Sequence, residues 1–158
     1  MERQKPSVLI ADRANWDGNT IPCFEMGHVS FGVVPKLTPL NLITNRDLID
    51  VTIAEDGGAV LGACLTLLTY STWRDAKGLY VVDLFIDGKA RNRGIGLKLW
   101  REAGRRGRAK GARFIKLEVY HTNEGAARFY ERLGFVRNDK DRLFLLEDDR
   151  VTAFLSAE

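Results

Sequence analysis

The chain has 158 residues, of which 45% are hydrophobic and 28% charged, so it supplies one filled core and is too short to need two. We therefore expect a single domain over residues 1–158, and neither a disordered chain nor a repeat protein. No stretch has the apolar core of a signal peptide or the ~20 apolar residues of a membrane span, so we expect a cytoplasmic protein.

The charges are unevenly distributed along the chain. The net charge is +3, yet the segment from Lys89 to Arg113 holds ten Lys or Arg residues against one acid, Glu102, which leaves 14 basic and 20 acidic residues elsewhere. One cationic segment on an acidic body predicts a polyanionic ligand that is held locally. Cys23 and Cys64 lie far apart with no second pair of metal ligands, which favours buried free thiols and no metal site.

The first half of the chain predicts an antiparallel sheet. A short strand at residues 7–11 precedes a mixed segment without clear periodicity, and helix caps with spaced leucines predict a short helix at 45–50. Two β-rich runs flank Glu55–Gly58, which is typical of a hairpin. The apolar run over 59–70 predicts a strand that is buried on both faces, and residues 78–86 predict a further buried strand.

The second half alternates strands and helices. Residues 94–110 show apolar positions at helical spacing with arginines on the other faces, and Gly111 is a natural stop. Expected after it, in chain order, are a strand over 112–120, a helix over 123–134, and strands over 135–138 and 142–147. Strands joined by helices usually lie parallel, so the fold class we expect is α/β with a mixed sheet.

Glycines and arginines meet where the strand over 78–86 leads into the helix. The first amides of a helix have no intrahelical partner and favour a phosphate, which Gly94 and Gly96 let approach the backbone. Gly96 is not followed by the Lys-Ser or Lys-Thr of a P-loop, and a dinucleotide fingerprint needs a third glycine where this chain has Leu99. A third phosphate motif, Arg/Gln-x-x-Gly-x-Gly/Ala, matches Arg91-Asn92-Arg93-Gly94-Ile95-Gly96 without a gap.

With this motif the chain resembles the GCN5-related N-acetyltransferase (GNAT) superfamily, whose acetyl-CoA diphosphate loop carries it. A second stretch, "NEGAARFYERLGF" from Asn123 to Phe135, resembles the family's Asn-x-x-Ala-x-x-Phe-Tyr-x-x-x-Gly-Phe signature. The stretches "YSTW" and "GLYVVDLFI" further resemble the branch of diamine acetyltransferases. The resemblance covers residues 51–146. It implies the GNAT fold, a mixed and mostly antiparallel sheet with a splayed parallel pair of central strands, flanked by helices.

The resemblance also implies a cosubstrate, acetyl-CoA, and the residues that hold it. The backbone of one strand end pairs with the pantetheine arm as an added strand would. The loop after that strand cradles the diphosphate, and two residues of the later signature contact the cofactor. The cofactor-binding residues implied in this way are Leu84, Phe85, Ile86, Arg91, Asn92, Arg93, Gly94, Ile95, Gly96, Leu97, Asn123 and Ala126.

Family chemistry is direct attack of an amine on the thioester, and the resemblance implies Tyr130 as the acid that protonates the CoA thiolate. The alternative for Tyr130 is packing beneath the cofactor. Diamine acetyltransferases usually carry Glu-Asp where this chain has Val82-Asp83. Asp83, whose pKa desolvation would raise, is either the base or a substrate contact, or it holds a loop or a backbone N–H. The other candidate bases are Glu118, His121, His28 and a water chain.

The acceptor is expected to be a small molecule or peptide with a primary amine, and the candidate substrate residues are Tyr70, Trp73 and His121. Tyr70 and Trp73 equally suit ordinary packing, and His121 suits a surface or capping role. Two rival functions are a catalytically silent acyl-CoA sensor and a nucleic-acid-binding module that uses Arg101, Arg105, Arg106 and Arg108. We expect no nucleic-acid partner and no membrane, and the apolar segment near the C-terminus favours a homodimer.

Overall fold

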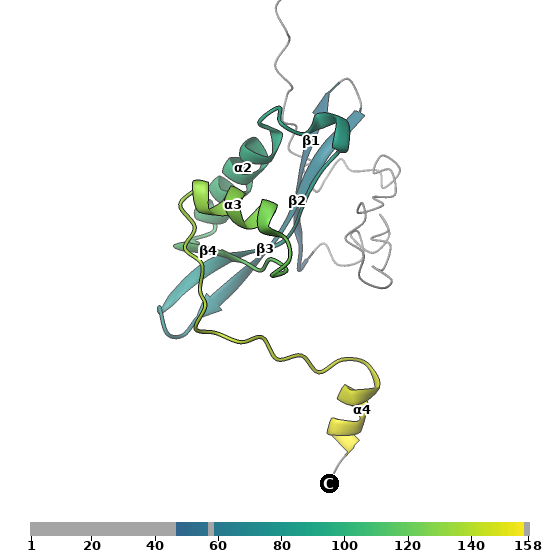
Figure 1. The fold of residues 1–158 in the computed structure, drawn as a ribbon. Coiled ribbons are helices and arrows are strands. Elements are labelled where there is room, and N and C mark those ends of the chain that lie inside the picture. Colours follow the sequence, from purple (N-terminus) through teal and green to yellow (C-terminus); the bar gives the residue numbers. More distant parts are fainter. Residues whose placement is uncertain (1–46, 57–58, 157–158) are drawn as a thin grey trace, which may run out of the picture. The chain divides into compact units, whose positions relative to one another are not determined.

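A computed structural model of the chain describes residues 47–56 and 59–156 (Figure 1). These residues form two compact units that divide between Glu118 and Val119. The first unit contains β1 (Asp50–Asp56), β2 (Ala59–Ser71), β3 (Ala76–Ile86), the 3-10 turn η1 (Gly88–Ala90), α2 (Ile95–Ala109) and β4 (Phe114–Leu117). The second contains α3 (Glu124–Arg132) and α4 (Asp149–Ser156). The strand expected at 7–11, Cys23, His28 and the hairpin tip at 57–58 lie outside the described residues.

The sheet of the first unit has the strand order β1-β2-β3-β4. Strands β1, β2 and β3 pair antiparallel as two hairpins, and β4 pairs parallel to β3 through the connection that contains α2. The expected mixed sheet, mostly antiparallel with one parallel pair, is therefore confirmed. Residues 62–66 of β2 are all buried, as the continuous apolar run predicts. Burial on both faces over the whole run 59–70 is not observed, since Leu68 is 40% and Tyr70 56% exposed.

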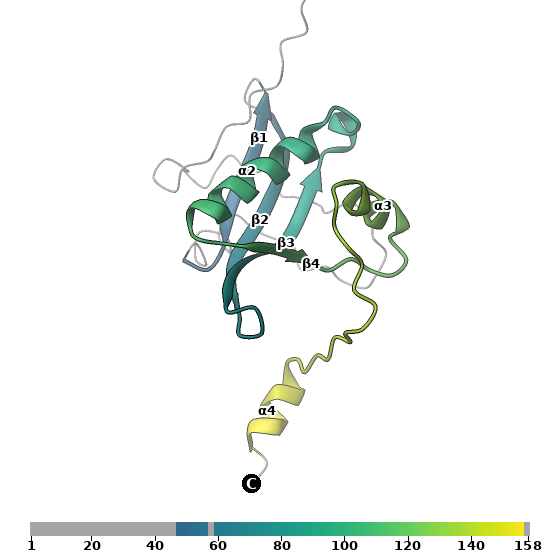
Figure 2. The same ribbon diagram turned by 90° about the vertical axis from the view of Figure 1, so that its left-hand side faces the viewer.

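Helix α2 covers one face of this sheet (Figure 2). Its buried residues recur at helical spacing, and at Gly107 the helix comes so close to β3 that an added Cβ would lie 2.9 Å from a side-chain carbon of Leu79. Arg106 reaches from the helix to β1, where its Nη1 donates to the carbonyl oxygen of Val51 at 3.2 Å. On the opposite face, Ile53, Ala63 and Leu65 form a second apolar cluster.

Three predictions of local structure are wrong. The helix expected at 45–50 is absent from its described residues, since Asp47 and Leu48 form a turn and Asp50 begins β1, where it pairs with Thr66. The strands expected at 135–138 and 142–147 are also absent, and Phe144 is 85% exposed. A strand needs a ladder partner and a half-buried surface, and β propensity alone supplies neither. Residues 149–156 form a helix that the sequence analysis did not anticipate, with Asp149 in the first turn, where the helix dipole favours it.

Candidate active site

Strand β3 is longer than its parallel neighbour β4. The last pair between them is Val81 with Leu117, whereas β3 continues for five residues to Ile86 (Figure 2). On its other side β3 remains paired with β2 up to Ile86, which lies opposite Gly62. The end of β3 therefore presents an edge that β4 does not cover, and such an edge can receive an extended ligand in the manner of an added strand.

The loop that follows β3 is fixed at both of its ends. Asp87 donates its backbone N–H to the carbonyl oxygen of Leu61 at 2.9 Å, and its Oδ1 accepts from the backbone N–H of Lys89 at 2.9 Å. Ala90 and Ile95 are 1% and 2% exposed and anchor the loop in the core on either side of its exposed part. The backbone of residues 91–94 is therefore held in place while its surface stays open to solvent.

The loop leads into α2 through a left-handed glycine. Gly94 has φ +74° and is the N-cap of α2, no side chain caps the helix there, and a Cβ added at Gly94 would meet nothing within 4 Å. Asn92 is also left-handed, with φ 60°. The first amides of α2 thus meet open space beside a residue without a side chain, which is the geometry that binds phosphate at helix N-termini. The loop fits the diphosphate of a CoA thioester.

The two arginines of the motif hold the loop to the sheet. Arg91 donates from Nε to the carbonyl oxygen of Ile86 at 3.4 Å, and Arg93 forms an ion pair with Asp56 at 3.7 Å. Both arginines are exposed. They keep positive charge at the entrance of α2 while bracing the turn.

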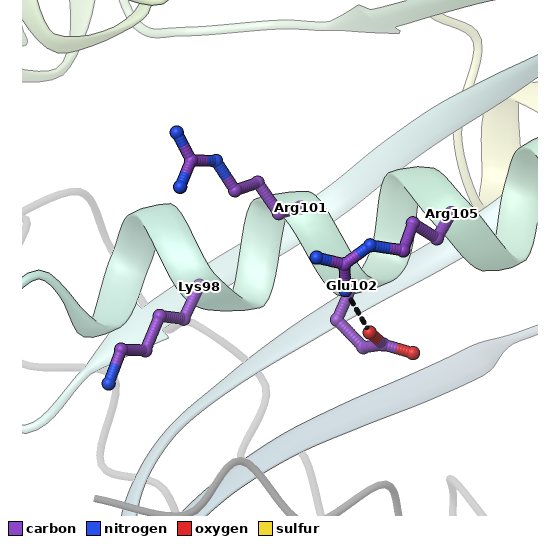
Figure 3. A pocket seen from close by; sticks show the side chains of 4 residues that line it. All are labelled: Lys98, Arg101, Glu102 and Arg105. Carbon is purple, nitrogen blue, oxygen red and sulfur yellow. Dashed lines mark hydrogen bonds and ion pairs between the residues drawn. The ribbon is translucent and has the colours of Figure 1, made fainter. Parts of the chain in front are cut away.

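A shallow hollow on the outer side of α2 is lined by Lys98, Arg101, Glu102 and Arg105 (Figure 3). Arg105 is paired with Glu102 at 2.6 Å. Arg106 points instead to β1, and Arg108 donates to the carbonyl oxygen of Ala112 at 3.5 Å. The four arginines of the rival nucleic-acid reading therefore do not share one solvent-facing surface.

Asp83 lies near the end of β3 and is half-buried. Desolvation by burial raises the pKa of its carboxyl above the ordinary value. Its negative charge also acts on Cys64, whose pKa is raised to about 12, first by burial and then by Asp83. Cys64 is a free thiol, as expected, and stays protonated at neutral pH. Burial thus makes the Asp83 carboxylate hold a proton more tightly than an exposed aspartate does.

The structure does not bring the expected substrate residues Tyr70 and Trp73 next to Asp83. Asp83 lies opposite Leu65 in the ladder, and Tyr70 is five residues further along β2, on the order of 17 Å at the usual rise of a strand. The hydroxyl of Tyr70 donates to the carboxylate of Asp75. Trp73 is 95% exposed in the turn between β2 and β3.

In the second unit, the residues of the later signature are arranged around α3. Asn123 is the N-cap of this helix, and its Oδ1 accepts from the backbone N–H of Ala126 at 3.1 Å. This capping hydrogen bond uses the side-chain oxygen of Asn123, so the side-chain nitrogen of Asn123 is the group that can donate to a ligand. Tyr130 packs edge-on against Phe129 and Phe135, with ring centroids 5.3 and 5.8 Å apart. His121 is exposed in the turn before the helix.

Two polar residues of the first unit were not predicted from the sequence. Tyr80 on β3 and Lys116 on β4 lie opposite each other in the parallel ladder, close to the point where it ends. The pattern of the sequence holds no signal for them, because their proximity depends on the register between two strands that a helix separates. Glu118, one of the candidate bases, follows directly after β4, and burial and then the charge of Glu118 raise the pKa of Tyr80.

Within the described residues, no three His, Cys, Asp or Glu side chains gather in a way that would hold a metal ion. None of the helices in the same part of the chain is long and apolar enough to cross a membrane.

Comparison with known proteins decides the family. The model of the acetyltransferase (GNAT) family matches residues 29–135. The chain belongs to this family. The match contains both the loop at the start of α2 and the signature around α3, so the two motifs that pointed to GNAT acetyltransferases lie in the family's own region. Members of the family use acetyl-CoA as the acetyl donor.

Two curated relatives have the same chemistry in their names. The chain is 31% identical over 97 residues to thialysine N-epsilon-acetyltransferase from Bos taurus, a match that covers 61% of this chain and 56% of that protein. It is 33% identical over 81 residues to an uncharacterized N-acetyltransferase in the pepI 3' region of Lactobacillus delbrueckii subsp. lactis, covering 51% and 46%. The chain thus spans about half the length of the curated relatives it matches.

A solved structure supports the fold. An integron cassette protein from the mobile metagenome of V. cholerae superposes with a TM-score of 0.79 over 98% of this chain and 100% of its own, at 17% sequence identity. At that identity the similarity shows a shared GNAT-type fold and carries no further conclusion on activity.

Proposed function

We propose that this chain transfers the acetyl group of acetyl-CoA to a primary amine. The proposal is supported by two structural features that follow each other along one stretch of backbone. A strand edge that β4 does not cover, at residues 82–86, is followed within a few residues by an open helix N-terminus that suits a diphosphate. CoA has the same order of groups, an amide-containing pantetheine arm and then a diphosphate.

The residues of β3 and its loop have separate tasks in this proposal. The backbone of Leu84, Phe85 and Ile86 pairs with the amides of the pantetheine arm, and the amides at the start of α2 bind the diphosphate. Gly94 allows the phosphate to approach, since a Cβ there would occupy open space beside those amides. Bound acetyl-CoA supplies an activated acetyl group, and the family resemblance adds Asn123 and Ala126 as contacts to the same cosubstrate.

Asp83 is the proposed base. A primary amine has a pKa near ~10.4 and arrives protonated, so it must lose a proton before its nitrogen can form a bond to the acetyl carbon. Burial raises the pKa of Asp83, which makes its carboxylate a better proton acceptor than an exposed aspartate. As the carbon–sulfur bond breaks, the thiolate of CoA takes a proton, and Tyr130 is proposed as its donor on the family pattern.

The acceptor class follows from the relatives and from the charge. Both curated relatives are named N-acetyltransferases, and one is named for thialysine, which carries a primary amine at the end of its side chain. Outside the cationic segment this chain has 14 basic and 20 acidic residues, which favours a cationic acceptor over an acidic one. We propose a small primary amine or a lysine side chain.

The test is the release of free thiol from acetyl-CoA, measured over a panel of polyamines, amino acids, aminoglycosides and lysine peptides. We expect amine-dependent release with at least one of them, together with saturable binding of CoA in a calorimetric titration. Binding of CoA with no release for any amine supports the sensor instead. Absence of both CoA binding and thiol release would overturn the proposal.

A further inference from the structure

An ion pair joins the loop before α2 to a strand on the other side of β2. Asp56 is the last residue of β1 and is paired with Ala59 in the ladder, so its backbone is held by the sheet. Arg93 belongs to the loop that follows β3, which is two strands away in the order β1-β2-β3. The Nη2 of Arg93 lies 3.7 Å from Oδ2 of Asp56. A carboxylate of the sheet thus faces an arginine of the loop.

The two arginines of this loop differ in the charge of their partners. Arg91 donates from Nε to the backbone carbonyl oxygen of Ile86, which carries no net charge. Arg93 faces a carboxylate, which offsets its positive charge. Arg93 also lies directly before Gly94, the N-cap of α2, where the first amides of the helix meet open space. The arginine that precedes the open amides is therefore the one that an acidic side chain neutralises.

This ion pair is weak enough to exchange its partners. The side chains of Arg93 and Asp56 are 45% and 49% exposed, and their charged atoms are 3.7 Å apart. Exposed pairs of this kind contribute little to stability, because water and salt screen the charges and two side chains lose conformational freedom. A diphosphate carries more negative charge than one carboxylate and can accept two parallel hydrogen bonds from a guanidinium. A diphosphate at the start of α2 can therefore take Arg93 from Asp56.

We propose that Asp56 is a positioning residue, which holds Arg93 in the free protein and competes with the diphosphate of CoA for its guanidinium. The inference rests on the proposed function, in which acetyl-CoA binds with its diphosphate at the start of α2. When acetyl-CoA binds, the guanidinium of Arg93 leaves Asp56 and pairs with the diphosphate. When CoA leaves, the guanidinium returns to Asp56. Asp56 thereby lowers the affinity for CoA and speeds the release of this product.

Faster release is useful in this reaction because the substrate acetyl-CoA and the product CoA carry the same diphosphate. Contacts to the diphosphate bind both molecules alike, so they add nothing to the chemical step itself. A loop that bound the diphosphate too tightly would retain CoA after the transfer and delay the next acetyl-CoA, since product release often limits turnover. The carboxylate of Asp56 gives Arg93 a partner within the protein as the diphosphate departs.

The experiment measures CoA binding to the wild type, Asp56→Asn and Asp56→Glu by calorimetry. We expect Asp56→Asn to lower the Kd for CoA by roughly two- to fivefold at about 0.1 M salt, the effect of one exposed ion pair. Asp56→Glu keeps a carboxylate and should bind CoA as the wild type does. At about 1 M salt the difference between Asp56→Asn and the wild type should nearly disappear, since the screening length falls from ~10 to ~3 Å.

Two control variants separate the ion pair from a general effect of charge. Glu55→Gln removes the same charge from the neighbouring residue of β1, and Glu102→Gln releases Arg105 on the outer side of α2. Both should lower the Kd for CoA less than Asp56→Asn does. Arg93→Met should weaken CoA binding, and adding Asp56→Asn to Arg93→Met should change the Kd little, because the arginine for which the two anions compete is already absent.

A kinetic measurement tests the role in product release. Acetyl transfer is inhibited with a CoA analogue that lacks the thiol group, in competition with acetyl-CoA. The inhibition constant should fall in Asp56→Asn by the same factor as the Kd for CoA. A merely structural role for Asp56 predicts the opposite direction, since a loosened loop would bind both CoA and the analogue more weakly.

The outcomes distinguish this inference from the proposed function. Tighter CoA binding in Asp56→Asn than in the wild type, with no acetyl transfer to any amine in either protein, supports the competition for Arg93 and contradicts the acetyl transfer. Equal or weaker CoA binding in Asp56→Asn, in a protein that still transfers acetyl groups, would overturn the inference and leave the transferase intact. An equal gain of affinity in Glu55→Gln or Glu102→Gln would overturn it as well.

Discussion

At the scale of single residues, substitution of Tyr130 tests the chemical step separately from the binding of acetyl-CoA. Its ring packs edge-on against Phe129 and Phe135, so Tyr130→Phe preserves the packing and removes only the hydroxyl. If that hydroxyl protonates the CoA thiolate, the substitution should lower kcat by ~10²–10⁴ and change the KM for acetyl-CoA little. The reason is that it removes one proton transfer and leaves the contacts that bind acetyl-CoA in the ground state unchanged. Steady-state kinetics measures both constants, with Tyr120→Phe as the matched control. A rate equal to that of the wild type would leave Tyr130 as a packing residue.

Protonation of Asp83 is expected to change activity and stability in opposite directions. A base must be deprotonated, so a raised pKa moves the acid limb of the kcat/KM profile above the range of an ordinary carboxyl, and Asp83→Asn should remove this limb and lower kcat/KM by ~10²–10⁴. The folded state also binds the proton of Asp83 more tightly than the unfolded state. Its contribution to stability is therefore fully present below the unfolded value of 3.8 and is lost as pH rises through the folded pKa.

The same substitution is consequently expected to stabilise the fold at neutral pH. Asp83→Asn removes a desolvated charge, so its melting temperature should exceed that of the wild type at pH above the folded pKa and equal it at strongly acidic pH. Thermal unfolding across a pH series measures the difference. Loss of stability in Asp83→Asn at neutral pH, together with normal activity, would instead assign Asp83 a structural hydrogen bond to a neighbouring loop.

At the scale of elements, the two ends of α2 allow a controlled test of the phosphate loop. Gly94 before the helix and Gly111 after it both have positive φ, +74° and +92°. An alanine at either position costs about 1–2 kcal/mol of backbone strain. The Cβ at Gly94 also enters the open space beside the first amides of α2, whereas a Cβ at Gly111 meets only the side chain of Lys77, at 3.6 Å.

We therefore expect Gly94→Ala and Gly111→Ala to lower the melting temperature to a similar extent, and only Gly94→Ala to weaken CoA binding, by tenfold or more. Chemical denaturation gives the two free energies of unfolding, and calorimetry gives the two dissociation constants. Equal CoA affinity in both variants would show that the diphosphate does not lie against the start of α2.

The accuracy of the sequence predictions differs between elements for a physical reason. Helix α2 and its ends were predictable because the apolar spacing, Gly94 and Gly111 are local signals within one element. The strands expected at 135–138 and 142–147 depended on a partner elsewhere in the chain, and β propensity does not specify one. The site shows the same division, since the Arg91–Gly96 loop is readable from consecutive residues, and the β-bulge at Val82, which puts Asp83 on the same face of β3 as Tyr80, exists only in the register with β2.

At the scale of the whole molecule, the distribution of charge predicts which polyanion binds. The chain carries a net charge of +3, but ten of its 24 basic residues lie between Lys89 and Arg113, and the rest of the sequence has more acids than bases. Within the cationic segment, Arg106 is engaged with β1 and Arg105 with Glu102. A compact anion such as CoA can meet the remaining charge locally, whereas a long duplex would also meet the acidic residues.

We predict that the protein binds CoA much more strongly than nucleic acid, and that added salt does not reverse this preference. Calorimetric titrations with CoA and with a short DNA duplex should show CoA binding that weakens moderately between about 0.1 and 1 M salt, as the screening length falls from ~10 to ~3 Å. The duplex should neither bind at the lower salt concentration nor compete with CoA. Displacement of CoA by the duplex, with the steep salt dependence that multiple phosphate contacts produce, would instead support the nucleic-acid module and leave the acetyltransferase fold with a different ligand.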